Sequence, residues 1–308
     1  MGNILKVNSV SDYSAYHGLT DRHRLISVID FDEISPIRNS LNQYGVYGLF
    51  MHKSLSIELT YGCGKYDYTN GTLICVAPGQ IGGKEDDGSR IDLDGWGLLF
   101  HPDLLHGTLL EKRIKDYSFF DYRINEALHM TENEYDIFAS FMRQIKGELE
   151  NKHDDVQDSI IVGYIELMLN FCRRFYNRQF ITRKLENSDI LAKFETLLHE
   201  YFKNGSQVAC GLPSMQYFSD RLYLSSNYLG DLIKKTTGNT ATFHIRKFVM
   251  QEAKNNLASG MTISETAYAL GFDFPQHLSR MFKKYEGISP SQYITSIRKG
   301  CTHQNNVE

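Results

Sequence analysis

The sequence predicts an α+β protein with a β-rich N-terminal part, a helical middle segment and an all-α C-terminal part. Up to about residue 110, short runs rich in Val, Ile, Leu and aromatic residues alternate with turn signals, as in an antiparallel sandwich or barrel. From about residue 102 onward, apolar residues recur at helical spacing instead. Near the C-terminal end one short phrase occurs twice, which indicates a structural repeat.

Five runs of β-forming residues predict the strands of the N-terminal part. Turn dipeptides such as Asn70-Gly71 and Pro78-Gly79 separate these runs, which cover residues 24–31, 46–51, 55–60, 72–77 and 97–100. The Gly- and Asp-rich stretch 79–94 predicts a surface loop.

Two long helices are predicted next. Thr131 followed by Glu134 forms a capping-box pattern that opens a helix ending near Glu150. A second helix covers about residues 155–178 and has a wide apolar stripe that includes Ile161, Ile165, Met168 and Cys172. A stripe of this width fits burial in its own domain, a helix–helix seam in a dimer, or both. The polar residues 182–189 predict a linker, so the first domain is expected to cover residues 1–181.

Composition and charge narrow the class of protein. With 308 residues, 42% hydrophobic and 23% charged, the chain is an ordinary globular protein of about two domains. It has no apolar run of membrane-spanning length, and its start lacks the features of a signal peptide. Its five cysteines are scattered without a CxxC pair, which favours reduced thiols in the cytoplasm over a disulfide framework or a zinc knuckle. Residues 212–300 hold 11 Lys or Arg against 6 Asp or Glu, and the rest of the chain holds 22 against 31. Residues 212–300 are therefore basic, and the rest of the chain is acidic.

The repeated phrase lies in a predicted C-terminal domain of residues 190–300, followed by a tail of residues 301–308. Residues 228–240 (YLGDLIKKTTGNT) and 277–289 (HLSRMFKKYEGIS) align with Lys235 on Lys284. Each copy predicts the second helix of a helix-turn-helix, and a glycine ends each one. A helix over about residues 240–259 joins the two units, which is the arrangement expected of two heads that enter one face of duplex DNA.

The exposed faces of the two repeated helices carry the residues expected to contact DNA. Side chains with amide, guanidinium, imidazole, hydroxyl or carboxylate groups can read base edges, and those expected to do so are Asn227, Asp231, Gln276, His277, Ser279 and Arg280. Phosphate contacts are expected from Ser226, Lys234, Lys235, Lys283 and Lys284. Ser225 or Ser226 is expected to cap the first reading helix, and Asp273 the second, with Pro275 in its first turn.

The C-terminal part resembles the DNA-binding domain of the AraC/XylS family of transcriptional regulators. The phrases that carry the resemblance are residues 263–267 (ISETA), 271–272 (GF), 279–284 (SRMFKK) and 287–293 (GISPSQY). The resemblance implies a one-component regulator of transcription that binds promoter DNA, forms a homodimer and is able to contact RNA polymerase. Gly230 and Asp231 depart from the family pattern because many members carry DNA-contacting side chains there. His244 replaces a common aromatic and Val249 a common arginine, so we expect the second unit or the dimer to supply more of the specificity.

The same resemblance implies a cupin-like N-terminal β-barrel that binds an effector, followed by a helical dimerisation segment. Tyr47, Phe50, Tyr61 and Trp96 are expected to line the effector pocket, where aromatic rings could stack on a sugar or another ring, although core packing would also explain them.

Three functional alternatives remain open from sequence. A regulator controlled by a small molecule is preferred over one switched by another protein and over a metal-dependent cupin enzyme with a DNA-binding tail. His52, His101 and His106 contain no HxH pair, and no phosphate-binding loop or nucleophile elbow is present, so we expect no catalytic residues, no cofactor and no metal.

Overall fold

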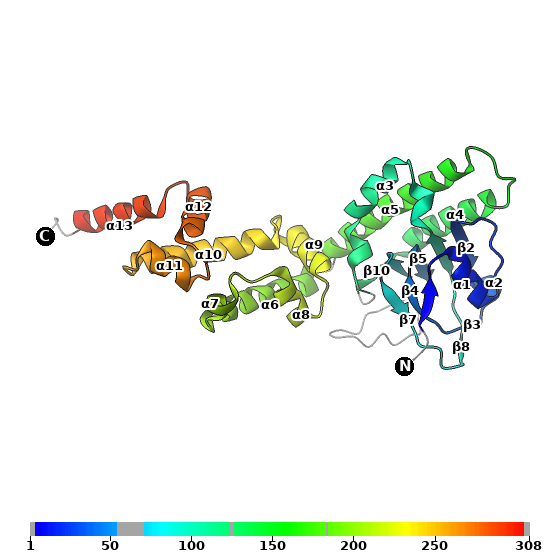
Figure 1. The fold of residues 1–308 in the computed structure, drawn as a ribbon, viewed down its shortest axis with the longest axis horizontal. Coiled ribbons are helices and arrows are strands. Elements are labelled where there is room, and N and C mark those ends of the chain that lie inside the picture. Colours follow the sequence, from blue (N-terminus) through cyan, green and yellow to red (C-terminus); the bar gives the residue numbers. More distant parts are fainter. Residues whose placement is uncertain (1–3, 54–70, 124–125, 183, 305–308) are drawn as a thin grey trace. The chain divides into compact units, whose positions relative to one another are not determined.

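The computed structural model describes residues 4–53, 71–123, 126–182 and 184–304 (Figure 1). The chain divides into two compact units, Met1–Thr182 and Arg183–Glu308. Within the described residues, no helix is both long and apolar enough to cross a bilayer.

The first unit contains an antiparallel five-stranded sheet and two smaller sheets. The large sheet has the order β10 (Leu128–His129), β6 (Thr72–Val76), β5 (Tyr47–His52), β9 (Trp96–Phe100) and β2 (Ile26–Asp30). In the second sheet the central strand β4 (Leu41–Tyr44) pairs with β1 (Leu5–Val7) in parallel and with β7 (Ile81–Gly83) antiparallel. Strands β3 (Ile37–Arg38) and β8 (Arg90–Ile91) form the third.

The predicted α+β class is therefore confirmed, but the described strands do not form a closed barrel. They make three separate sheets, and the strands between residues 78 and 94 are two or three residues long. Gly, Asp and Pro are frequent in this stretch, and they favour turns over a continuous strand ladder.

The two faces of the large sheet have different partners. One face joins the small sheets and α1 (Val10–His17) around a core that includes Val10, Phe31, Tyr44, Phe50 and Val76. Ser9 caps α1 in a capping box with Asp12. The sheet also contacts α4 (Glu132–Glu148) and α5 (Gln157–Thr182) (Figure 1). Short helical segments complete the unit: α2 (Phe31–Ile34), η1 (Pro102–Leu105), α3 (Leu109–Arg113), η2 (Ile114–Asp116) and η3 (Ser118–Asp121).

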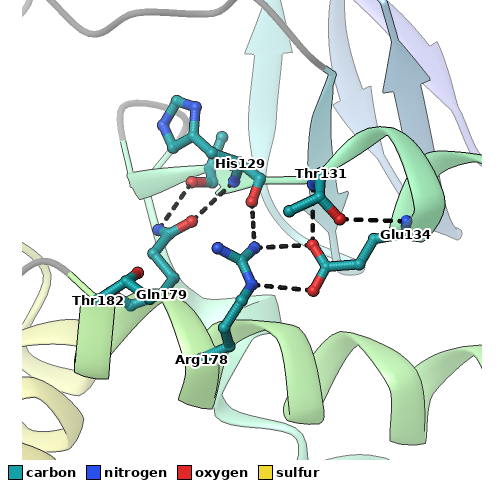
Figure 2. A network of polar contacts seen from close by, with 7 residues as sticks. His129, Thr131, Glu134, Arg178, Gln179 and Thr182 are labelled. Carbon is teal, nitrogen blue, oxygen red and sulfur yellow. Dashed lines mark hydrogen bonds and ion pairs between the residues drawn. The ribbon is translucent and has the colours of Figure 1, made fainter.

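The predicted capping box of α4 is present, and it belongs to a polar network (Figure 2). The Thr131 hydroxyl accepts from the Glu134 N–H, and Glu134 accepts from the Thr131 N–H at 2.9 Å. Arg178 of α5 holds the same carboxylate through two N–O contacts of 2.8 Å each. One residue further along α5, the Gln179 amide accepts from His129 N–H at 2.7 Å and donates to the Ala127 carbonyl oxygen at 3.3 Å. The network ties α5 to both α4 and β10.

The apolar stripe on α5, for which burial in its own domain and a dimer seam both remained open from sequence, is buried inside the first unit. Ile161, Ile165, Met168 and Cys172 each have an exposed fraction of 0%. They lie on the side of α5 that packs within the unit, as the first of these alternatives expects.

The second unit is entirely helical in its described residues. Its helices are α6 (Lys184–Lys203), α7 (Ser206–Cys210), α8 (Met215–Leu222), α9 (Ser226–Thr237), α10 (Ala241–Ala258), α11 (Ile263–Ala269), α12 (Pro275–Glu286) and α13 (Pro290–Gln304). The sequence predicted a linker over residues 182–189, whereas Thr182 is the last residue of α5 and residues 184–189 form the first turns of α6. Lys, Leu and Glu are good helix formers, so the polar composition of this stretch is compatible with a helix.

A close backbone contact joins the two halves of the second unit. Gly271, which follows α11, has φ +82°, and a Cβ placed there would lie 2.3 Å from the Gln207 carbonyl oxygen of α7. The Gln207 amide donates to the Ala269 carbonyl oxygen at 3.0 Å. Only glycine combines this backbone conformation with so close an approach.

Candidate nucleic-acid interface

Helix α9 is positioned by defined start and stop signals. Ser225, and not Ser226, is its N-cap, and the Ser225 hydroxyl accepts from the Tyr228 N–H at 3.2 Å. The Ser226 hydroxyl lies 3.0 Å from that of Ser219 in α8. Gly238 ends the helix in the left-handed conformation with φ +77°.

The two faces of α9 separate core from surface as the spacing predicts. Tyr228, Leu229, Leu232 and Ile233 are buried. Asn227, Lys234 and Lys235 are exposed, while Asp231 and Ser226 are half-buried. The exposed face therefore presents one amide near the start of the helix and two cations in its last turn.

Helix α12 repeats this arrangement with a different start. Its N-cap is Phe274 rather than Asp273, and the cap makes no side-chain hydrogen bond. Pro275 occupies the first turn, and the residue before a proline is held in an extended conformation, which Phe274 adopts with φ −138° and ψ 132°. The α helix therefore begins one residue later than a cap at Asp273 requires.

The polar side of α12 has three exposed side chains with base-reading chemistry near its start. Gln276, His277 and Arg280 are exposed, whereas Leu278 and Phe282 have an exposed fraction of 0%. No hydrogen bond or ion pair to the Gln276 or Arg280 side chain occurs among the described residues. Ser279 is half-buried, and its hydroxyl donates to the Pro275 carbonyl oxygen at 3.1 Å.

Cations end both reading helices. Lys283 and Lys284 lie exposed in the last turn of α12, as Lys234 and Lys235 do in α9. Helix α10 adds exposed Arg246 and Lys247, which were not among the residues predicted to contact DNA. The sequence feature that could have predicted them is a pair of adjacent basic residues on the helix that joins the two helix-turn-helix motifs.

Helix α10 sets the spacing between the two helix-turn-helix motifs of the second unit. Its 18 residues correspond to about 27 Å of helix. The reading helices of paired heads on one face of B-DNA lie about 34 Å apart. A joining helix of this length, with α9 before it and the α11–α12 pair after it, has suitable dimensions for neighbouring major-groove segments.

The aromatic residues predicted for an effector pocket do not come together. Phe50 lines a cavity of about 180 Å³ between the large sheet, the small sheets and α1, together with Tyr13, His17, Asn42 and Tyr44. Tyr47, three residues earlier in β5, stacks on Phe100 at 5.2 Å on the other face of the sheet, because side chains alternate along a strand. Trp96 pairs with Met51, the neighbour of Phe50, and so also lies on that other face. Tyr61 lies outside the described residues.

Comparison with known proteins gives the class of the second unit. Residues 218–296 match a family model described as a helix-turn-helix domain. Over 77 residues the chain is 32% identical to the uncharacterized transcriptional regulatory protein YesN of Bacillus subtilis, covering 24% of this chain and 21% of YesN. Over 167 residues it is 24% identical to the uncharacterized HTH-type transcriptional regulator YijO of Escherichia coli, covering 54% and 56%. The chain thus spans about a fifth of one relative and just over half of the other.

The chain also has detectable similarity to solved structures. The C-terminal domain of the two-component response regulator yesN from Fusobacterium nucleatum is 27% identical, with a TM-score of 0.29, and the match covers 32% of this chain and 96% of that one. ToxT from Vibrio cholerae is 13% identical with a TM-score of 0.30, covering 82% of this chain and 87% of ToxT.

The second unit is therefore a DNA-binding domain of the helix-turn-helix class, with two such motifs in tandem. The family match and the similarity to YesN agree with the resemblance of residues 263–293 to AraC/XylS-type domains.

Proposed function

We propose that the chain is a one-component transcriptional regulator that reads two adjacent major-groove segments of promoter DNA with α9 and α12. The observation that carries this proposal is the repeated geometry: each helix buries an apolar face and exposes polar residues near its start and two lysines at its end. Asn227 and Asp231 of α9, and Gln276, His277, Ser279 and Arg280 of α12, read bases. Ser226, Lys234, Lys235, Lys283 and Lys284 contact phosphates.

The second reading helix contributes more specificity than the first. Arg280 can donate two parallel hydrogen bonds to guanine, and Gln276 can form a pair with adenine. In α9 the corresponding surface contains Gly230, which has no side chain, and half-buried Asp231, whose carboxylate repels phosphate. A cytosine amino group is the base feature that Asp231 could accept from.

Selection of bound sequences from a random duplex pool by the full-length protein tests the proposal. We expect two short conserved elements about one helical turn apart. Arg280→Ala should relax preference at one base position by about 1–3 kcal/mol, while Lys284→Ala should weaken all sequences alike and lower the salt slope by about 1. Arg280→Lys is the matched control because it keeps the charge but loses the planar fork, so it should also relax preference. Unchanged preference in both Arg280 variants would refute the assigned reading face.

We propose further that the first unit, a cupin-like sandwich, receives a small-molecule effector in the cavity beside Phe50. Both ring nitrogens of His17 and the Asn42 Oδ1 atom are buried and have no hydrogen-bond partner among the described residues, and both residues line this cavity. Polar atoms left unpaired in an apolar cavity favour a ligand that supplies their partners. At about 180 Å³ the space accepts a ligand of about one ring, such as a monosaccharide. A thermal-shift panel tests this, since ligands that bind the native state raise its melting temperature; a panel without any shift would favour control by a protein partner.

A homodimer is proposed to form through the outward face of α5, not through the buried stripe. Ile160 and Leu167 are 41% and 43% exposed, and Tyr164 and Phe171 beside them are half-buried. Positions 160, 164, 167 and 171 follow the alternating spacing of four and three that coiled coils use.

A cytoplasmic regulator that acts on promoter DNA and is able to contact RNA polymerase is preferred over the metal-dependent cupin enzyme. The histidines that would serve such an enzyme are engaged separately: the His52 Nδ1 atom lies 2.8 Å from the Asp94 carbonyl oxygen, and the His101 Nδ1 atom lies 3.4 Å from Asp103.

A further inference from the structure

Three metal-ligand side chains from separate parts of the chain meet at one corner of the first unit. His23 precedes β2, His153 lies between α4 and α5, and Asp158 is in the first turn of α5. One ligand atom from each residue lies within 4.8 Å of the other two. None of these residues belongs to the proposed reading helices or to the cavity beside Phe50.

The His23–Asp158 contact has the dimensions of two ligands on a shared ion. The His23 Nε2 atom lies 3.2 Å from the Asp158 Oδ1 atom. Apart from this contact the oxygen has no hydrogen-bond partner among the described residues, and the Asp158 side chain is 50% exposed. Two ligand atoms bound to a tetrahedral Zn²⁺ at roughly 2.0–2.1 Å each are about 3.3 Å apart. The separation is therefore as expected for an ion beside both atoms, and it also suits the direct Nε2–H···O contact of the metal-free protein.

His153 is oriented for metal binding by a second layer of hydrogen bonds. The Gln157 amide nitrogen donates to the Glu148 carbonyl oxygen at 2.7 Å, which turns the amide oxygen toward the His153 Nδ1 atom at 2.8 Å. Because that oxygen only accepts, Nδ1 carries the ring proton and the Nε2 lone pair is left for an ion. Metal-binding histidines in proteins are commonly held in this way.

His23 must change tautomer when the ion binds. Its Nδ1 atom accepts from the Leu25 N–H at 3.2 Å, so in the neutral ring the proton is on Nε2. Binding moves this proton to Nδ1, breaks the Leu25 contact and places the Nε2 lone pair on the ion. The His23 side chain is 11% exposed, so its ring is already held in place.

We propose that His23, His153 and Asp158 bind a divalent transition-metal ion of the Zn²⁺ type, with water completing the coordination. Two imidazoles and one carboxylate are a ligand set that such ions favour over Mg²⁺ or Ca²⁺, which prefer oxygen. The bound ion links the segment before β2 to the start of α5, next to the Arg22–Glu150 pair at 3.5 Å. It therefore stabilises the end of the helix whose outward face is proposed to form the dimer.

Zn²⁺ and Co²⁺ titration of tag-free, chelator-treated full-length protein tests the site. We expect a single ion to bind with micromolar or tighter affinity, a higher melting temperature of the first unit, and the visible absorption of tetrahedral Co²⁺. His153→Ala and the shape-preserving Asp158→Asn should each weaken binding at least tenfold while circular dichroism stays unchanged. His106→Ala is the matched control, because His106 is an exposed histidine 3.7 Å from Asp103 and should leave binding as in the wild type.

Two results would overturn the proposal. One is the absence of Zn²⁺ binding to the wild type at micromolar concentration. The other is unchanged affinity in both the His153 and Asp158 variants, which would place the ion elsewhere.

Discussion

Replacing Arg178 by Met should destabilise the first unit through the carboxylate that it leaves behind. The Glu134 side chain is 10% exposed, and Arg178, at 32% exposed, supplies two of its contacts at 2.8 Å. Removing one partner of a buried ion pair costs about 3–5 kcal/mol. Arg178 is partly exposed and Glu134 keeps the Thr131 N–H at 2.9 Å, so we reduce the expected loss to about 2–3 kcal/mol.

The single tryptophan makes this measurable in one unit of the chain. Trp96 is in β9, so urea unfolding followed by its fluorescence reports the first unit without the second. Arg174→Met is the control on the same helix, because Arg174 is exposed and contacts only the Phe171 ring, at 5.2 Å, among the interactions described. Adding Glu134→Gln to Arg178→Met should recover part of the loss, since the amide removes the buried charge. A loss in Arg178→Met no larger than in Arg174→Met would refute the reasoning.

Three further predictions concern other parts of the molecule. Gly271→Ala should destabilise the second unit by at least about 2 kcal/mol in thermal unfolding followed by circular dichroism, because φ is +82° and the new Cβ would meet the Gln207 carbonyl oxygen. The control Gly230→Ala in α9, whose new Cβ meets no atom within 4 Å, should be neutral or stabilising. Equal effects of the two variants would contradict the proposed contact. Burial lowers the pKa of His17 to about 4 from 6.5, so the folded state binds this proton less readily than the unfolded state. The contribution of neutral His17 to the stability of the first unit is therefore fully present above pH 6.5 and is lost between pH 6.5 and 4. After allowance for partial exposure, the loss is about 1–2 kcal/mol. His17→Gln should remove that pH-dependent part of the tryptophan-detected stability, and an unchanged pH profile would show that His17 is not its source. Leu167→Glu, on the outward face of α5, should shift analytical ultracentrifugation toward monomer with little loss of stability, whereas an unaltered dimer would place the interface elsewhere.

The sequence predicted the reading helices well because their signals are local. The spacing of Leu229, Leu232 and Ile233, the serine before the helix and the glycine after it all act within one or two turns. The start of α12 was misassigned because Asp273 is a better capping residue than Phe274, while the restriction imposed by Pro275 decides the outcome.

The first unit was harder to predict because its side chains are placed by long-range pairing. Whether Trp96 shares a face with Phe50 depends on the pairing of β9 with β5, which no local pattern encodes. The wide stripe of α5 similarly did not reveal which residues face the unit, and Ile161 is buried while its neighbour Ile160 is 41% exposed. Strands of two or three residues, such as β3 and β8, are too short for a period to appear.

The contact between Gly271 and the Gln207 carbonyl has a consequence for the DNA that the protein accepts. Together with α10 it fixes the second motif against helices that precede the first, so the two motifs cannot adjust independently. One inserted base pair between two half-elements rotates the second by about 35° around the duplex axis. Two motifs joined by a flexible linker would tolerate that rotation. In this domain, one of the two motifs would instead lose contact with its half-element. The spacing between the two half-elements of the operator should therefore be fixed, and inserting one base pair between them should weaken binding more than changing one base.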